Sequence, residues 1–424
     1  MAPSRPDPSS APRFRYLDRP EAANGFLAEV GAARDLAVDT EAASFHRFAD
    51  RVYLLQLTAR VDAGQPGERE LSAVVDPLSA GPLAALGRLI EDPAVETVFH
   101  DADYDLRLLR QDYGWQVRGL FDTRVAAQLL GERAFGLAAL LEKEFGVRLD
   151  KRHQRADWSM RPLTADMLDY AAQDTIWLLG LRDRFRERLA ALGRTAWAAE
   201  EFARLEGVQW AAGDDPDGYL RTKGARDLTR RELALLRELV AWRDGVARDL
   251  DRATFRVAAN DVLLEVARRA PTTRDALQAI RGVPRGSLDG RAGEMLDAVA
   301  RGLAVPEAEL PRFPRAPRWD KDPDFDDRVS RLRTARDGVA ARLDLDPGVL
   351  CARDRLEAVA RRNPRAPEEL AEVTELRRWQ VEVLGDALLA ALRTGSGGGG
   401  GRAAAPTPAA RPPAPPERSP YRDA

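Results

Sequence analysis

Cysteine is almost absent from the chain, and long hydrophobic runs are absent altogether. Cys351 is the single cysteine among 424 residues, which excludes an intrachain disulfide and any zinc site built from cysteines. No apolar run approaches the roughly 20 residues that a membrane-spanning helix needs. We therefore expect a soluble protein without membrane association, and nothing in the sequence argues against a reducing cytoplasm.

The chain also lacks an excess of positive charge. Its net charge of -3 gives no global reason to expect a nucleic-acid partner. Lysine is confined to Lys143, Lys151, Lys223 and Lys321, so arginine carries nearly all of the positive charge. Because a guanidinium group pairs with phosphate through two parallel hydrogen bonds, local basic faces could still bind nucleic acid. A GC-rich genome would produce the same arginine bias, so both interpretations stay open.

The length is sufficient for several domains, each with its own core. A composition rich in Pro, Gly and Ala predicts disorder at both ends, and the N-terminal lead lacks the apolar core of a signal peptide. The predicted order is a disordered lead (1–25), a mixed α/β domain (26–205), a linker (206–226), a first all-helical domain (227–305), a proline-rich linker (306–323), a second all-helical domain (324–393) and a disordered Gly/Pro/Ala tail (394–424).

Short aliphatic stretches bounded by Gly, Asp and Pro predict strands, and a 3.6-residue periodicity predicts helices. The predicted strands are Leu36–Glu41, Val52–Thr58, Leu71–Asp76 and Thr97–Phe99, with the first two as an antiparallel pair. The predicted helices are Leu83–Glu91, Tyr104–Asp112 stopped by Gly114, and one that Asp122 caps at its N-terminus.

The helical region contains an internal repeat. A capping box, Thr229–Glu232, opens its first helix. Arg243–Ala247 recurs as Arg336–Ala340, and the same offset carries Val266–Arg269 onto Val359–Arg362. The offset is too long for a solenoid, so the repeat predicts tandem copies of one small domain. The two arginines that end each of the latter segments could form basic faces for RNA or be solvated helix surface.

Two carboxylates separated by one residue end the first predicted strand. Successive side chains of a strand point to opposite faces, so Asp39 and Glu41 share a face while Thr40 looks away. Two like charges at this spacing repel, and burying them is costly unless a cation lies between them. The pair suggests a metal site. The alternative is a solvent-facing edge strand that happens to carry two acids.

Two further stretches combine acids with helix signals. Asp101, Asp103 and Asp105 crowd a predicted helix start, where the helix macrodipole favours negative charge and capping alone explains one or two of them. Tyr170 and Asp174 are four residues apart and therefore lie on one face of a helix. Each stretch by itself has a structural explanation.

Taken in order, the three stretches resemble the exonuclease motifs of the DEDD superfamily of 3′–5′ exonucleases, in its tyrosine-containing branch. The matching residues are Asp39-x-Glu41, Asp105 within His100–Leu109, and Tyr170-x-x-x-Asp174. The stretches Leu149–Lys151, Asp157–Leu163 and Tyr170–Asp174 are similar to those of ribonuclease D and its close relatives. The helical repeats are similar to the paired helicase-and-ribonuclease-D C-terminal (HRDC) domains of bacterial ribonuclease D. This resemblance covers about residues 26–393 and implies a ribonuclease H-like α/β domain with a mixed sheet, followed by two small helical bundles.

The resemblance also implies a reaction. Two divalent cations, Mg²⁺ or Mn²⁺, would be held by Asp39, Glu41, Asp105 and Asp174, and Tyr170 would orient the attacking water. Such cations prefer oxygen ligands, and a pair roughly 3.5–4 Å apart both activates water and stabilises the leaving 3′ oxygen. The implied enzyme is a 3′–5′ exoribonuclease that releases nucleoside 5′-monophosphates.

The implied substrate is RNA with a free 3′ end, tRNA precursors in particular, gripped by the two helical domains of a monomer. A 3′–5′ DNA exonuclease is one alternative, because no residue visibly reads a 2′-hydroxyl. A catalytically silent RNA-binding scaffold is another. Against the scaffold, every acid of the motif set is present.

Asp105 is preferred over its neighbours because it immediately precedes the Leu-x-x-Leu of the family pattern, and Asp101 is predicted to be a helix N-cap. His100 is expected to anchor the strand end, with a contact to substrate as the alternative. Gln56, on the neighbouring strand, could line the cleft and bind substrate.

Trp158 and Arg161 belong to a Trp-x-x-Arg-Pro-Leu stretch that matches the family. A tryptophan can stack on a base and an arginine can bind a phosphate, which suits a path for a single strand. A core tryptophan and an ion-paired arginine explain the same residues equally well.

Overall fold

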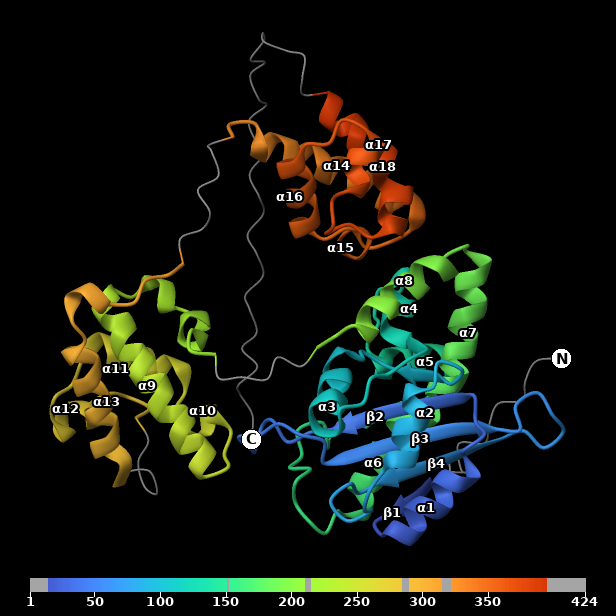
Figure 1. Cartoon of the computed structure of the whole chain (residues 1–424), viewed down its shortest axis with the longest axis horizontal. Coiled ribbons are helices and arrows are strands. Elements are labelled where there is room, and N and C mark those ends of the chain that lie inside the picture. Colours follow the sequence, from blue (N-terminus) through green and yellow to red (C-terminus); the bar gives the residue numbers. More distant parts are fainter. Residues whose placement is uncertain (1–13, 151, 210–214, 284–289, 315–321, 395–424) are drawn as a thin grey trace.

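The structure is a computed structural model, and it describes residues 14–150, 152–209, 215–283, 290–314 and 322–394. The predicted disorder before Phe14 and after Thr394 lies outside these residues, as does much of the predicted proline-rich linker. Figure 1 shows three folded bodies: an α/β domain (residues 14–209), a first helical domain (215–314) and a second helical domain (322–394).

A six-stranded mixed sheet forms the centre of the α/β domain, in the order β1-β4-β3-β2-β5-β6. β2 and β3 are antiparallel, as are β3 and β4, whereas the pairs β1–β4, β2–β5 and β5–β6 are parallel. The strands are β1 (Phe14–Leu17), β2 (Asp35–Glu41), β3 (Leu54–Val61), β4 (Arg69–Val75), β5 (Glu96–Phe99) and β6 (Leu120–Asp122).

Helices cover both faces of this sheet. Leu36, Val38 and Leu55 point to one face and join a large core with residues of α2 and α3, while α6 packs across β2, β3 and β4 on the other. The helices are α1 (Pro20–Glu29), α2 (Ala84–Glu91), α3 (Asp103–Tyr113), α4 (Thr123–Leu129), α5 (Leu137–Phe145), α6 (Ala165–Ile176), α7 (Leu178–Ala191) and α8 (Thr195–Glu206).

The predicted strands and helices of this domain are confirmed within a few residues at their ends, as is the antiparallel β2–β3 pair. The extent of the disordered lead is wrong. Phe14–Leu17 forms β1, and Pro20 opens α1. β1 pairs in parallel with β4, a partner distant in sequence, so local composition gave no signal for this strand.

The first helical domain has a core of its own, built around the long helix α9. The predicted capping box is confirmed: Thr229 accepts a hydrogen bond from the backbone N–H of Glu232, whose side chain accepts one from the N–H of Thr229. Two short 3₁₀ helices with buried Tyr219 and Ala225 already belong to this core, in the segment predicted as a linker. The elements are η1 (Gly218–Arg221), η2 (Ala225–Asp227), α9 (Arg230–Asp249), α10 (Thr254–Val257), α11 (Asn260–Arg269), α12 (Arg274–Gln278), α13 (Ala292–Ala304) and η4 (Glu307–Glu309).

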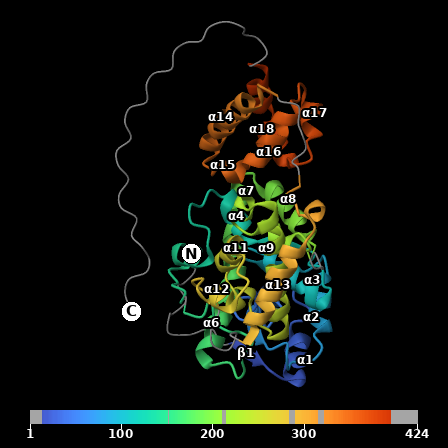
Figure 2. The same cartoon turned by 90° about the vertical axis from the view of Figure 1, so that its left-hand side faces the viewer.

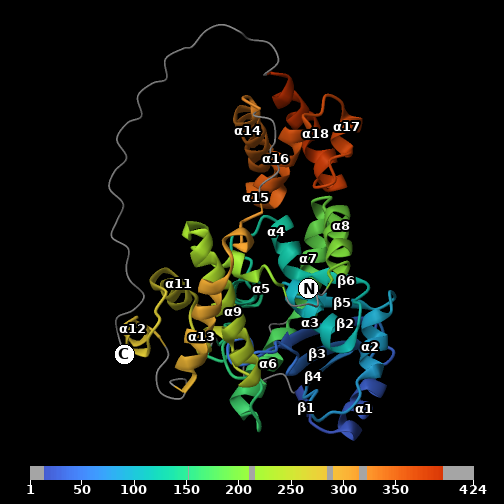
Figure 3. The same ribbon diagram turned by 60° about the vertical axis from the view of Figure 1, so that its left-hand side comes forward.

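The second helical domain repeats this arrangement. α16 and α17 match α11 and α12 in length and position at the offset of the sequence repeat, which confirms the tandem copies. Figure 2 and Figure 3 show this domain stacked on the end of the α/β domain that carries α4, α7 and α8. Its helices are α14 (Phe325–Leu343), α15 (Pro347–Leu350), α16 (Arg353–Arg362), α17 (Pro367–Ala371) and α18 (Arg378–Arg393).

Within the described part of the chain, no helix is both long and apolar enough to cross a bilayer.

Candidate active site

The C-terminal end of β2 is open along one edge. The parallel pairing of β2 with β5 ends at Ala37 opposite Val98, while the antiparallel pairing with β3 continues to Glu41. Asp39 and Glu41 share the face that α6 covers, and both are partly accessible. A rigid, singly paired strand end therefore presents two carboxylates at the rim of the sheet.

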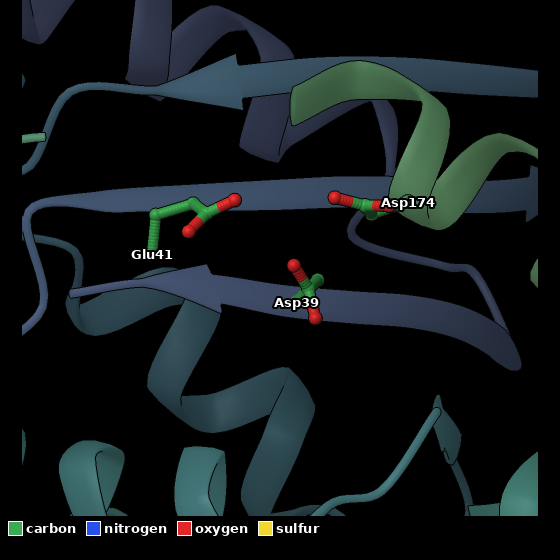
Figure 4. A group of neighbouring side chains, drawn as sticks. All are labelled: Asp39, Glu41 and Asp174. Carbon is green, nitrogen blue, oxygen red and sulfur yellow. The ribbon is translucent and has the colours of Figure 1, made fainter. Parts of the chain in front are cut away.

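Helix α6 brings the third carboxylate. Thr164 caps its N-terminus by accepting a hydrogen bond from the N–H of Met167 at 3.2 Å. One helical turn separates Tyr170 from Asp174, and the helix packs across β2 and β3. One oxygen each of Asp39, Glu41 and Asp174 lies within 4.8 Å of the others, and Figure 4 shows the three side chains converging from β2 and α6.

Asp105, in the first turn of α3, lies beside this group but is not part of it. Its Oδ1 accepts hydrogen bonds from the backbone N–H of Thr40, at 3.1 Å, and from the Thr40 hydroxyl. The amide of Thr40 faces the side where pairing with β5 has ended, so Asp105 supplies the acceptor that a strand would otherwise supply. Thr40 thus fixes the fourth acid, a role that the sequence did not reveal because the two residues are 65 positions apart.

The predicted N-cap role of Asp101 is wrong. Its backbone is left-handed, with φ of 67°, and its carboxylate pairs with Arg124. Asp122 accepts hydrogen bonds from the backbone N–H groups of this turn, from Asp101 at 3.2 Å and from Ala102 at 2.8 Å. It also accepts from the N–H groups of Arg124 and Val125, which confirms its predicted cap of α4.

Burial and mutual repulsion raise the pKa of every acid in the cleft. Burial, then the charge of Asp174, holds the pKa of Asp39 well above its usual value, and burial followed by Asp39 does the same for Asp105. The pKa of Glu41 is raised by burial and then by the charges of its three neighbours. Burial, with a smaller effect of Asp105, raises the pKa of Asp174 to about 7. With a pKa of about 7, Asp174 is partly protonated near neutral pH.

The donor set fits a hard divalent cation. All of the converging atoms are carboxylate oxygens, the ligands that Mg²⁺ and Mn²⁺ prefer. An ion about 2.1 Å from each ligand requires oxygens within about 4.2 Å of one another, so a small closure of the observed group suffices. A cation would also relieve the repulsion that raises the four pKa values.

Tyr170 lies at the edge of the cluster. Its ring is 6.0 Å from that of Trp158 and 5.8 Å from that of His153, measured between centroids. Burial and the charges of Asp174, Glu41 and Asp39 raise the pKa of the phenol, which therefore keeps its proton. A protonated phenol can donate to or accept from a water molecule, but it cannot act as an anionic base.

Trp158 lies in the core and not on the surface. It is 1% exposed and packs with Leu54 and Val74 under α6. Arg161 donates to both oxygens of the buried Asp76 and to the carbonyl of Tyr53. These surroundings match the structural alternative for both residues, and a role in binding substrate is not supported by the observed contacts.

His100 follows the end of β5, and Gln56 lies on β3. His100 Nδ1 lies 2.9 Å from the hydroxyl of Thr123, and burial lowers the pKa of its ring to about 4. A neutral histidine bonded to the start of α4 anchors the end of β5. Gln56 is fully buried on β3, directly opposite Asp39.

Comparisons with known proteins identify the family of the chain. A family model described as 3′–5′ exonuclease matches residues 14–190, and one described as HRDC domain matches residues 232–299 and again 325–392. Ribonuclease D of Granulibacter bethesdensis is 33% identical over 77% of this chain and 81% of its own length. The chain belongs to the ribonuclease D family. Ribonuclease D of Acidiphilium cryptum is 31% identical over 91% of this chain and 94% of its own.

Solved structures agree with the family assignment. A protein from Bifidobacterium adolescentis is 26% identical, covers 92% of this chain and 99% of its own, and superposes with a TM-score of 0.76. Escherichia coli RNase D shares the fold at 24% identity, with 90% and 99% covered and a TM-score of 0.68. As a ribonuclease D family member with a 3′–5′ exonuclease domain, the chain is a 3′–5′ exoribonuclease, and its predicted fold class is confirmed.

Proposed function

We propose that this exoribonuclease hydrolyses RNA 3′ ends with two divalent cations and releases nucleoside 5′-monophosphates. The observation that carries the proposal is the convergence of Asp39, Glu41 and Asp174 from β2 and α6, with Asp105 fixed beside them by Thr40. Crowding four acids in this way is unfavourable because their charges repel, and bound cations would offset that repulsion.

Bound cations would supply Lewis acidity for the attacking water and for the leaving 3′ oxygen. The chain provides the rest. Asp39 and Glu41 are held by the strand ladder and Asp174 by a helix, so the three ligands keep their spacing while RNA enters and product leaves. Tyr170 would hold the water in line with the scissile bond through its protonated hydroxyl.

The finer substrate assignment is RNA with a free 3′ end, tRNA precursors in particular. Membership of the ribonuclease D family supports it, as do the two helical domains, which extend the surface available to a structured RNA beyond the cleft. Three of the four duplicated arginines, Arg269, Arg361 and Arg362, pair with carboxylates of their own domains, so they are weak support for an RNA-binding face. We further propose that the protein is cytoplasmic and monomeric. Light scattering of the purified protein would test the monomeric state.

The test offers the purified protein a 5′-labelled RNA and a DNA strand of the same sequence, each with Mg²⁺, Mn²⁺ or EDTA. The proposal predicts a ladder of RNA products shortened from the 3′ end with either cation, and intact RNA in EDTA. Preferential shortening of DNA would favour a DNA exonuclease, and binding without cleavage under all conditions would favour a scaffold. A tRNA precursor with a 3′ extension, compared with an unstructured RNA, tests the finer assignment.

A further inference from the structure

Gln56 is a buried polar residue without a partner. Its side chain is 0% exposed on the central strand β3, and neither its amide nitrogen nor its amide oxygen has a hydrogen-bond partner among the described residues. Buried carboxamides are almost always hydrogen-bonded, because desolvating one without compensation is unfavourable. The missing partner therefore needs an explanation.

The position of Gln56 supplies one. It lies directly opposite Asp39 in the antiparallel β2–β3 pair, and directly opposite residues project on the same face. In such a pair the two Cβ atoms are about 4.5–5.5 Å apart, within reach of a long side chain. Helix α6 covers this face, so the carboxamide is enclosed between α6 and the part of the sheet that carries Asp39.

The next polar residue on the same strand face shows what a purely structural group looks like. The Thr58 hydroxyl lies 2.9 Å from that of Ser72 on β4 and donates to the hydroxyl of Thr175 on α6 at 3.1 Å. Thr58 is as deeply buried as Gln56 but is fully satisfied by the chain. Of these two polar side chains, the one without a partner is the one that faces the carboxylates.

The carboxylate of Asp39, in turn, lacks a side-chain hydrogen-bond donor. The backbone N–H of Thr40 interacts with this carboxylate, but among the described residues no side chain donates a hydrogen bond to it, whereas Asp105 is also held by the Thr40 hydroxyl. A carboxylate that ligates a metal is normally held by a second hydrogen-bonding group that fixes its orientation. Gln56 carries an N–H donor at the appropriate strand position.

We propose that Gln56 is a positioning residue, whose amide N–H donates to the Asp39 carboxylate when that carboxylate ligates a divalent cation. The inference rests on the proposed function, because it needs the cation. Gln56 is too deeply buried to touch RNA, so its contribution is to hold the ligand and not to bind substrate.

The test is calorimetric titration of the full chain with Mn²⁺, comparing wild type with Gln56→Met, which keeps the side-chain length and removes the amide. Loss of a group that orients a metal ligand typically weakens metal affinity 10- to 100-fold, and we expect about that loss here. In EDTA the thermal midpoint of the variant should equal or exceed that of wild type, because no hydrogen bond of the metal-free state is lost.

Thr58→Val is the matched control on the same strand face. It removes hydrogen bonds that the chain does make, so it should lower the thermal midpoint in EDTA and leave Mn²⁺ affinity unchanged. Gln56→Leu serves as a second variant if Gln56→Met does not fold. Wild-type Mn²⁺ affinity in a folded Gln56 variant would overturn the inference alone, whereas absence of Mn²⁺ binding in wild type would overturn the proposed function itself.

Discussion

The two helical domains are copies of one repeat, yet they are attached to the α/β domain in different ways. The second helical domain shares one continuous hydrophobic core with the α/β domain. The first helical domain has a separate core and meets the α/β domain mainly through polar contacts at one loop. The same fold is therefore attached firmly in the second helical domain and weakly in the first.

The interface between the second helical domain and the α/β domain, called the second interface below, is packed like a protein interior. Trp197 of α8 stacks on Trp379 of α18 with 4.9 Å between ring centroids. Glu200 accepts hydrogen bonds from the N–H groups of Arg378 and Trp379 at 2.8 and 3.1 Å, so a side chain of one domain caps a helix of the other. Glu201 accepts from the indole N–H of Trp379 at 3.0 Å.

The interface between the first helical domain and the α/β domain, called the first interface below, involves the β2–β3 loop, which directly follows Glu41. Asp251 accepts from the N–H of Phe48 and pairs with Arg47, both at 3.2 Å, and Arg256 donates to the carbonyl of Phe45 at 2.6 Å. Phe48 packs against Val246, Ala247 and Val257, and the rings of Phe45 and Phe255 meet edge to face with 6.3 Å between their centroids.

Each helical domain also contacts the α/β domain through the same turn of the repeat. Asp251 and Asp344 are equivalent in the repeat, both are left-handed, and Asp344 pairs with Arg133 at 2.7 Å. The repeat thus carries a docking turn, and the surfaces around that turn decide whether the attachment is strong or weak. The weak attachment is the one at the loop that follows Glu41 of the carboxylate cluster.

The largest expected effect comes from removing the core of the second interface. Trp379→Ala should lower the free energy of unfolding by about 3–5 kcal/mol, the usual cost of deleting a buried aromatic side chain. Phe48→Ala, the matched change at the first interface, should cost only about 1 kcal/mol because Phe48 is half-buried. Urea unfolding measures both, and equal losses would remove the distinction between the interfaces.

The carboxylate cluster should make the free energy of unfolding depend on pH, whereas neither interface should do so. In EDTA the free energy of unfolding should fall as pH rises from about 4 through 7, because the folded cluster binds protons that the unfolded chain has lost. Asp174→Asn should stabilise the metal-free protein at pH 8 by up to about 4 kcal/mol, at about 1.4 kcal/mol per pKa unit. A wild-type profile that stays flat across this range would contradict the protonated cluster, whereas Trp379→Ala should shift the profile without changing its slope.

A smaller effect is expected from the helix cap that crosses the second interface. Glu200→Ala should cost about 1 kcal/mol, because it leaves two backbone N–H groups at the start of α18 without acceptors. Glu187→Ala, at an exposed position of α7, is the control and should change the midpoint of urea unfolding very little. The cap is unimportant if the two variants unfold at the same urea concentration.

The smallest expected effect comes from the docking turns. Asp251→Asn removes a partly exposed ion pair and Asp344→Asn a largely exposed one, each worth less than about 1 kcal/mol. Hydrogen exchange should nevertheless distinguish them. Asp251→Asn should speed exchange in residues 43–52, where the first interface depends on that turn, and Asp344→Asn should leave α8 protected by the shared core. Faster exchange in α8 would show that both attachments are equally weak.

Short-range signals in the sequence were sufficient for much of this structure. The spacing of Asp39 and Glu41 on β2, and of Tyr170 and Asp174 on α6, follows from the geometry of a strand and a helix. The cap at Asp122 is equally local. The repeat fixed the architecture of the helical domains because both copies had to form the same helices.

What was missed depends on distant partners. β1 forms only by pairing with β4, and the burial of Trp158, which the sequence left open, results from its packing under α6. The hydrogen bond from Thr40 to Asp105 and the stack of Trp197 on Trp379 join residues far apart in the chain. No local pattern encodes such contacts.

The account depends most directly on the carboxylate cluster, and one rate measurement tests it. With a 5′-labelled RNA and saturating Mg²⁺, Asp174→Asn should shorten the 3′ end at least about a thousandfold more slowly than wild type, equivalent to about 4 kcal/mol of lost transition-state stabilisation. Urea unfolding of the same preparation establishes that the variant is folded. A folded Asp174→Asn protein with the wild-type rate would contradict the assignment of the cluster as the catalytic metal site.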